Sequence, residues 1–116
     1  MSDKKEFKLA TYWQTQMSLY KGTASLPLTP RELGQIKSLF LKTGMLSRRL
    51  ITFAFQHWEQ FTAEVMSTTG SSTCPPHPHI GYLLAHWDIA IPLMVTLDIV
   101  AEDEAQLALA VVQLLD

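Results

Sequence analysis

Apolar residues recur at three- and four-residue intervals along most of the chain, as expected for helices that pack one face on a core. Six segments have this spacing: 6–20, 29–42, 46–66, 80–87, 88–100 and 101–115. No alternating pattern is long enough to predict a strand, although 89–100 holds enough branched residues to be ambiguous. The pattern therefore predicts an all-α fold of about five or six helices.

Helix boundaries are marked by specific residues. Thr29, Pro30 and Glu32 form a capping-box signature, in which Thr29 caps, Pro30 takes the first helical position and Glu32 reaches back. Gly44 is expected to end this helix. Asp88 is the expected cap of the fifth segment, with its start close before Pro92, because a proline deeper in a helix costs about 3 kcal/mol.

The length of 116 residues predicts one domain over 1–116. Residues 67–78 are rich in Ser, Thr, Gly and Pro and predict a mobile loop. The charged share of 17% lies below the ~25% of average soluble proteins, which excludes a disordered tail or a polybasic arm. The single cysteine, the lack of an apolar run of about 18 residues and the charged N-terminus together predict a cytoplasmic protein without a signal peptide.

Charge is divided unevenly along the chain. Residues 1–49 hold all nine Lys and Arg and three acids, a net charge of +6, whereas residues 50–116 hold eight acids and no Lys or Arg. The basic half suits phosphate and the acidic half suits a basic protein surface. Alternatively, the two halves face each other within the fold.

The basic residues gather around two predicted helices. The candidates for contact with nucleic acid or another anionic partner are Arg31, Lys37, Lys42, Arg48 and Arg49. The short connection through Gly44 fits a helix-turn-helix, whose second helix would present Ser47, Arg48, Arg49 and Thr52 to DNA. The alternative is a plain helical hairpin with a basic tip.

Histidine and cysteine offer weaker candidates. Cys74, His77 and His79 supply N and S ligands that zinc prefers, but their spacing fits no standard zinc module, so solvated histidines are the favoured interpretation. Two His-Trp pairs, at 57–58 and 86–87, suit either base stacking or, as we favour, a core tryptophan with a histidine at its edge. No catalytic motif is present, so we expect no enzyme and no cofactor.

Three stretches resemble a small helical accessory domain of phage and plasmid replication proteins. They are Leu28-Thr29-Pro30-Arg31-Glu32-Leu33-Gly34-Gln35-Ile36-Lys37, then His57-Trp58 with Phe61, and Pro78-His79-Ile80-Gly81-Tyr82-Leu83-Leu84-Ala85-His86. The resemblance implies a mobile-element protein that works at DNA or within a DNA-processing assembly. On this resemblance we expect the chain to stand alone, without the initiator or helicase domain that accompanies this accessory domain in the family.

The sequence thus predicts a non-enzymatic binding protein of a DNA-processing or nucleoprotein complex, with its basic half on nucleic acid or an anionic partner. The alternative is a small inhibitor of a host nucleic-acid-targeting complex, of the anti-CRISPR type, that docks on a protein through its acidic half. The acidic candidates are Glu59, Glu64, Asp88, Glu102, Asp103 and Glu104. The apolar segment 107–115 is a candidate homodimer seam.

Overall fold

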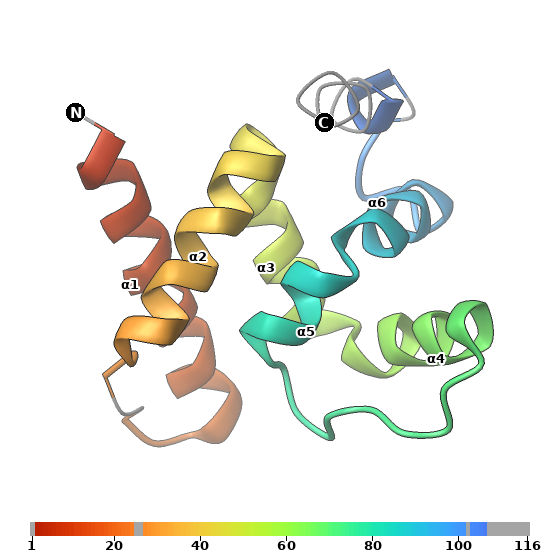
Figure 1. Cartoon of the computed structure of the whole chain (residues 1–116), viewed down its shortest axis with the longest axis horizontal. Coiled ribbons are helices and arrows are strands. Elements are labelled where there is room, and N and C mark those ends of the chain that lie inside the picture. Colours follow the sequence, from red (N-terminus) through yellow and green to blue (C-terminus); the bar gives the residue numbers. More distant parts are fainter. Residues whose placement is uncertain (1, 25–26, 102, 107–116) are drawn as a thin grey trace.

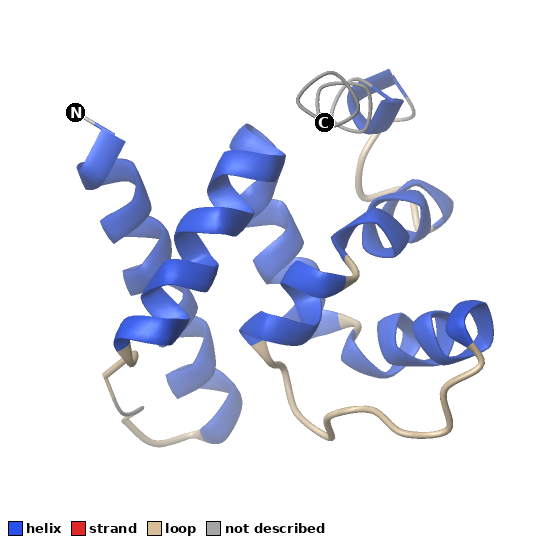
Figure 2. Ribbon diagram, in the orientation of Figure 1, coloured by secondary structure: helices blue, strands red, loops and turns tan. Residues whose placement is uncertain are grey.

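The computed structural model describes residues 2–24, 27–101 and 103–106. Within these ranges the chain forms six α-helices and a 3-10 turn, with no β-strand (Figures 1 and 2). The elements are α1 (Ser2–Lys21), α2 (Pro30–Thr43), η1 (Gly44–Leu46), α3 (Ser47–Gln56), α4 (Trp58–Thr69), α5 (Ile80–Ala85) and α6 (Trp87–Thr96). The predicted all-α class is confirmed, and the radius of gyration of 13.9 Å is that of a compact chain.

The start of α2 has the capping box that the sequence predicts. The Glu32 backbone N–H donates to Thr29 Oγ1 at 3.1 Å, and the Thr29 N–H donates to Glu32 Oε1 at 3.0 Å. Each bond satisfies an N–H that has no partner inside the helix. The helix ends at Gly44, as predicted, where the backbone has a positive φ of 53° that favours glycine.

The helices α1, α2 and α3 pack against one another, and one end of each lies at the same end of the molecule. η1 turns the chain back between α2 and α3, while α1 runs alongside α3 in the same direction (Figure 1). Contacts confirm this direction, because Tyr12 of α1 meets Thr52 and the later Tyr20 meets Phe55. The beginning of α1, the end of α2 and the beginning of α3 therefore lie at one end of the molecule.

The predicted third helix is interrupted. It was expected to run without a break over 46–66, but α3 ends at Gln56 and α4 begins at Trp58. His57 lies between them with φ −132° and ψ 34°, outside the helical region. The break lets Trp58 turn into the core, where its side chain is buried.

A second junction repeats the first. His86, with φ −126° and ψ 25°, separates α5 from α6, and the buried Trp87 begins the next helix. In both places an aromatic ring four residues earlier packs on the histidine ring, with centroids 5.6 Å apart for Phe53–His57 and 4.8 Å for Tyr82–His86. The His-Trp pairs are therefore helix junctions, and the preference for core tryptophans is confirmed.

The start of α6 differs from the prediction. The helix begins at Trp87, so Asp88 lies in its first turn instead of capping it, and Pro92 lies inside the helix. Burial of Trp87 fixes the start. Pro92 cannot donate to the carbonyl of Asp88, but both residues are exposed, so water can reach that carbonyl.

The irregular loop is shorter than predicted and lies along the end of the fold. α4 continues to Thr69, and Gly70 ends it in the left-handed conformation at φ 77°. The indole Nε1–H of Trp58 donates to the Pro75 carbonyl at 2.8 Å, which attaches the loop to the start of α4. The closing segment predicted over 101–115 is helical at 103–106, and the rest, with the proposed homodimer seam, lies outside the described residues.

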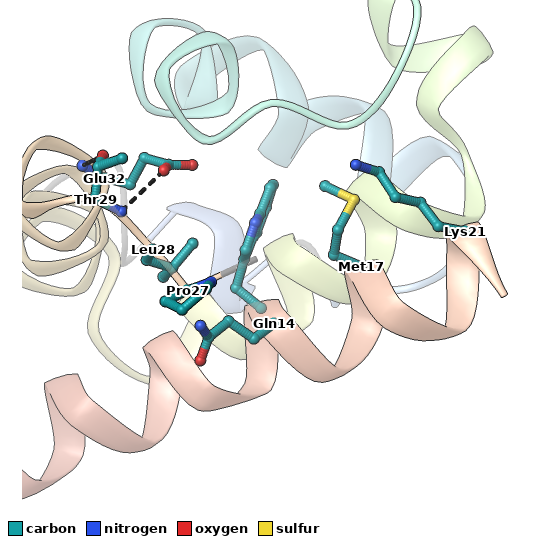
Figure 3. Close-up of a pocket in the computed structure, with 8 residues that line it drawn as sticks. Gln14, Met17, Lys21, Pro27, Leu28, Thr29 and Glu32 are labelled. Carbon is teal, nitrogen blue, oxygen red and sulfur yellow. Dashed lines mark hydrogen bonds between the residues drawn. The ribbon is translucent and has the colours of Figure 1, made fainter. Parts of the chain in front are cut away.

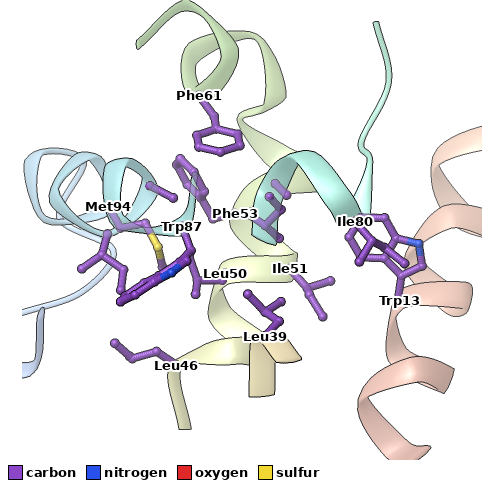
Figure 4. Packing of buried hydrophobic residues seen from close by; sticks show 14 of the residues in the cluster. Trp13, Leu39, Leu46, Leu50, Ile51, Phe53, Phe61, Ile80, Trp87 and Met94 are labelled. Atoms are coloured by element: carbon purple, nitrogen blue, oxygen red, sulfur yellow. The ribbon is translucent and has the colours of Figure 1, made fainter. Parts of the chain in front are cut away.

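The core gathers around α3. One face of this helix buries Leu50, Ile51, Phe53 and Ala54, each at most 1% exposed. In Figure 4, Leu39, Phe61, Trp87 and Met94 from other helices surround this face. No helix in the described ranges is both long and apolar enough to cross a membrane.

The capping box gives a first prediction. Replacement of Thr29 by Ala removes the acceptor for the Glu32 N–H and should lower the free energy of unfolding by about 1 kcal/mol. Urea unfolding measures this loss. Thr23→Ala, an exposed threonine in the turn after α1, is the matched control and should change stability little. Equal losses in the two variants would contradict a specific capping role.

Candidate functional site

Four basic residues lie at the end of the molecule where α1 begins, α2 ends and α3 begins. Lys8 comes from α1, Lys42 from the last turn of α2, and Arg48 and Arg49 from the first turn of α3. All four are exposed, and Met45, between them on η1, is 96% exposed. We call these four residues the cationic end.

An aromatic ring holds Arg48 in place. The guanidinium carbon lies 4.3 Å from the centroid of the Tyr12 ring, in cation–π geometry. The Tyr12 hydroxyl in turn hydrogen-bonds Thr52 Oγ1, one helical turn after Arg48. Lys8 is one turn before Tyr12 on α1 and therefore shares its face. At the cationic end, the contact between Tyr12 and Arg48 therefore links α1 to α3 and restrains the Arg48 side chain.

Arg49 has an acidic neighbour from the other half of the chain. Its Nη1 lies 2.8 Å from Glu104 Oε2, with the two side chains 50% and 45% exposed. An ion pair this exposed contributes little to stability and is easily exchanged for another anion. Within the described residues, the two charged halves of the chain therefore meet in this ion pair.

A hollow of about 320 Å³ opens beside the two arginines. Its lining includes Arg48, Arg49 and the buried Phe53, and Thr52 and Gln56 continue the lining along α3. Positive charge beside an apolar floor suits a ligand with an anionic group and an uncharged body.

The other predicted basic residues lie elsewhere. Arg31 is in the first turn of α2, about 16 Å along the helix axis from Lys42, and Lys37 lies about midway between them. Lys37 stands one turn from each of the exposed Leu33 and Leu41. Of the five predicted residues, the structure brings together only Lys42, Arg48 and Arg49.

The spacing of the basic residues could not reveal Lys8 and Tyr12 as members of the site, because α1 had no predicted position relative to α3. Tyr12 at four residues from Lys8 is a local signal, but an aromatic at helical spacing is typical of core packing.

The helix-turn-helix interpretation fits the connection but not the exposure of α3. Ser47 is buried, and its hydroxyl donates to the Gly44 carbonyl. Thr52 is held by Tyr12 and Arg49 is paired with Glu104, so these two proposed DNA contacts already have partners within the fold. The alternative of a helical hairpin with a basic tip describes this geometry better.

The acidic candidates are spread over several elements. Glu59 and Glu64 are exposed on α4, Asp88 is exposed on α6, and Asp103 and Glu104 follow α6. Glu102 lies outside the described residues. Only Glu104 forms an ion pair within the described part of the chain.

The candidate zinc ligands have other partners. His77 Nδ1 lies 3.1 Å from the Tyr20 hydroxyl, and His79 Nδ1 accepts the Tyr82 N–H at 3.1 Å as the cap of α5. No three His, Cys, Asp or Glu side chains within the described ranges are arranged to hold a metal ion. Cys74 is half-buried with a free thiol.

A further hollow of about 250 Å³ lies between α1 and the start of α2 (Figure 3). Lys21 and Glu32 stand on its rim, and Met17 and Leu28 line it. Glu32 is already held by the capping box drawn in Figure 3. None of the basic or metal-ligating candidates lines this hollow, and its lining holds one lysine and one glutamate, so it has no surplus of one charge.

Comparison of the chain with protein-family models, curated proteins and solved structures finds no significant match. The resemblance to accessory domains of phage and plasmid replication proteins therefore stays a prediction.

Tyr82 is half-buried among aromatic rings. Its ring packs against Trp58, Phe61 and His86, and its buried hydroxyl has no hydrogen-bond partner among the described residues. Burial, with a smaller contribution from the charge of Cys74, raises the pKa of the Tyr82 hydroxyl above its usual value of 10.0.

Tyr82→Phe tests this environment. Near neutral pH the variant should be as stable as the wild type or more stable by about 1 kcal/mol, because it lacks a buried hydroxyl without a partner. Above about pH 10 the unfolded wild type releases the Tyr82 proton more readily than the folded protein does, so wild-type stability should fall with pH. Urea unfolding from about pH 8 to about pH 11 should show the variant losing less stability. Parallel curves would refute the raised pKa.

Proposed function

We propose that this chain is a non-enzymatic binding protein of a phage- or plasmid-type DNA-processing complex and that it binds nucleic-acid phosphates through the cationic end. The convergence of Lys8, Lys42, Arg48 and Arg49 at one end of the fold carries this proposal. Phosphate contacts by Lys and Arg supply most of the affinity of non-specific nucleic-acid binding.

Two further features support the proposal. The Tyr12 ring holds the guanidinium of Arg48, so less side-chain freedom is lost when a phosphate binds. The exposed pair of Arg49 with Glu104 leaves Arg49 able to change partner at small cost. The negative charge of Glu104 lowers affinity for anions, and its removal should therefore strengthen binding.

The double variant Arg48→Glu/Arg49→Glu tests the proposed surface. Fluorescence anisotropy with labelled single- and double-stranded DNA at low and moderate salt should show binding by the wild type that weakens with salt. The variant should lose at least about tenfold in affinity, and its plot of log affinity against log salt should be shallower by about two units.

The matched control is Arg31→Glu/Lys37→Glu. It makes the same charge change on exposed residues of α2 that lie outside the cationic end. Its affinity should fall by no more than about threefold, which reflects the long-range field alone. Equal losses in the two double variants would show that net charge, and not this surface, determines binding. Absence of binding to either DNA at low salt would overturn the proposal.

The second candidate function is the protein-binding inhibitor. The observation that favours it is that α4, α5 and α6 carry no Lys or Arg, while Glu59, Glu64 and Asp88 are exposed without an ion pair in the described ranges. Such a surface complements the basic channel of a nucleic-acid-targeting complex.

A plasmid-clearance assay in cells with an RNA-guided nuclease tests the inhibitor function. Expression of the chain should preserve the target plasmid, and Glu59→Lys/Glu64→Lys should abolish this protection, because it places positive charge against a basic partner. Clearance at the same rate with and without the chain would exclude inhibition of that nuclease.

A further inference from the structure

A third hollow, of about 380 Å³, lies at the opposite end of α3 from the cationic end. It forms where α1 ends, α3 ends and α4 begins, so it depends on the break at His57. The ring-bearing residues Tyr20, Phe55, His57 and Trp58 line it together with Gln56 and Gln60. Aromatic surface with a few polar groups is the composition of sites that take flat organic rings.

The hollow beside the two arginines and this aromatic hollow adjoin each other along α3. Gln56 lines both of them, and the exposed face of α3 leads from Arg48 through Thr52 to Gln56. These positions are separated by four residues each and therefore share one side of the helix over about 12 Å. One extended ligand can reach the cationic end and the aromatic hollow together.

Tyr20 is an exposed aromatic ring held in a fixed orientation. Tyr20 is 45% exposed, and its ring packs against the Phe55 ring in an edge-on contact with the centroids 6.0 Å apart. On its other side the hydroxyl bonds His77, whose ring centroid lies 5.8 Å away. An aromatic ring that is both exposed and held by neighbours is suited to stack on a base.

The hollow also offers hydrogen bonds to a base edge. His57 Nδ1 lies 2.6 Å from Gln60 Oε1, which orients the Gln60 side chain. Amide groups supply both donors and acceptors, as base edges require. Glu59 adds negative charge to the lining, which disfavours a phosphate here but can accept from an exocyclic amino group. The charges therefore assign phosphate to the cationic end and the uncharged base to the hollow.

We infer that the ligand of this surface is single-stranded nucleic acid, with backbone phosphates at Arg48 and Arg49 and an unstacked base against Tyr20. The inference rests on the proposed function, because it names the nucleic acid that the cationic end binds. A duplex keeps its bases stacked and cannot place one in the hollow. Single strands combine the two contacts that this surface offers, a basic track and a stacking platform.

The test is fluorescence anisotropy at low salt with the whole chain and three labelled probes of about 12 residues or base pairs, within the usual ~4–16-nucleotide sites. The probes are a single-stranded DNA, an abasic strand of the same length and charge, and a duplex. The wild type should bind the single strand at least about fivefold more tightly than the abasic strand or the duplex.

Variants at Tyr20 locate the preference. Tyr20→Ala should bring affinity for the single strand down to that for the abasic strand and leave the abasic affinity unchanged. Tyr20→Phe keeps the ring, loses the bond to His77 and should retain most of the preference. Leu19→Ala changes a more exposed neighbour, 72% exposed, and is the matched control that should bind like the wild type.

The outcomes separate this inference from the proposed function. Equal binding of all three probes, with loss in Arg48→Glu/Arg49→Glu, would keep the phosphate-binding function and overturn the single-strand inference. A Tyr20→Ala variant that still prefers the single strand would also overturn it. Failure of every probe to bind the wild type would overturn both.

Discussion

Burial of one face of α3 is the constraint on which the rest of the structure depends. α1, α2, α4 and α6 all contact this helix, and Leu50, Ile51 and Phe53 on its buried face are almost without exposure. Apart from Ser47, the buried residues of that face are apolar, so rotating the helix would bring Arg48 or Arg49 into the core at a large desolvation cost. The core therefore fixes the direction in which both arginines point.

The sequence predicted those features of the fold whose causes are local. The capping box at Thr29 and the glycine stop at Gly44 depend on neighbouring residues, and the structure has both. The break at His57 was not predicted, because no Pro or Gly lies there and the helical spacing of apolar residues continues through it. The sequence does carry a repeated pattern at both breaks: an aromatic residue is followed four positions later by His, Trp and an acidic residue. The pattern begins once at Phe53 and again at Tyr82. Only the core, which needs both tryptophans turned inward, explains why that pattern interrupts a helix.

The candidate site was predicted in part for the same reason. The short turn through Gly44 was predicted from the sequence, and it brings Lys42 close to Arg48 and Arg49. Arg31 and Lys37 have the same charge, but the axial rise of α2 carries them away from the turn. Tyr12 could not be assigned to the site, because its contact with Arg48 crosses 36 residues and depends on how α1 packs on α3. Charge along a sequence therefore indicates which residues can bind an anion, while the packing of helices selects those that can do so together.

The break at His57 links the core to the proposed surface. A continuous helix over 46–66 would carry Trp58 onward along the same axis, and the end of α3 would present no recess beside Tyr20. With the break, Trp58 fills the core, its indole holds the loop at Pro75, and the loop brings His77 to the Tyr20 hydroxyl. The same turn that stabilises the fold thus orders an exposed ring some 12 Å along α3 from the cationic end. Because the helix that carries the arginines packs against the helix that carries the ring, the proposed phosphate and base contacts would lie at a fixed separation.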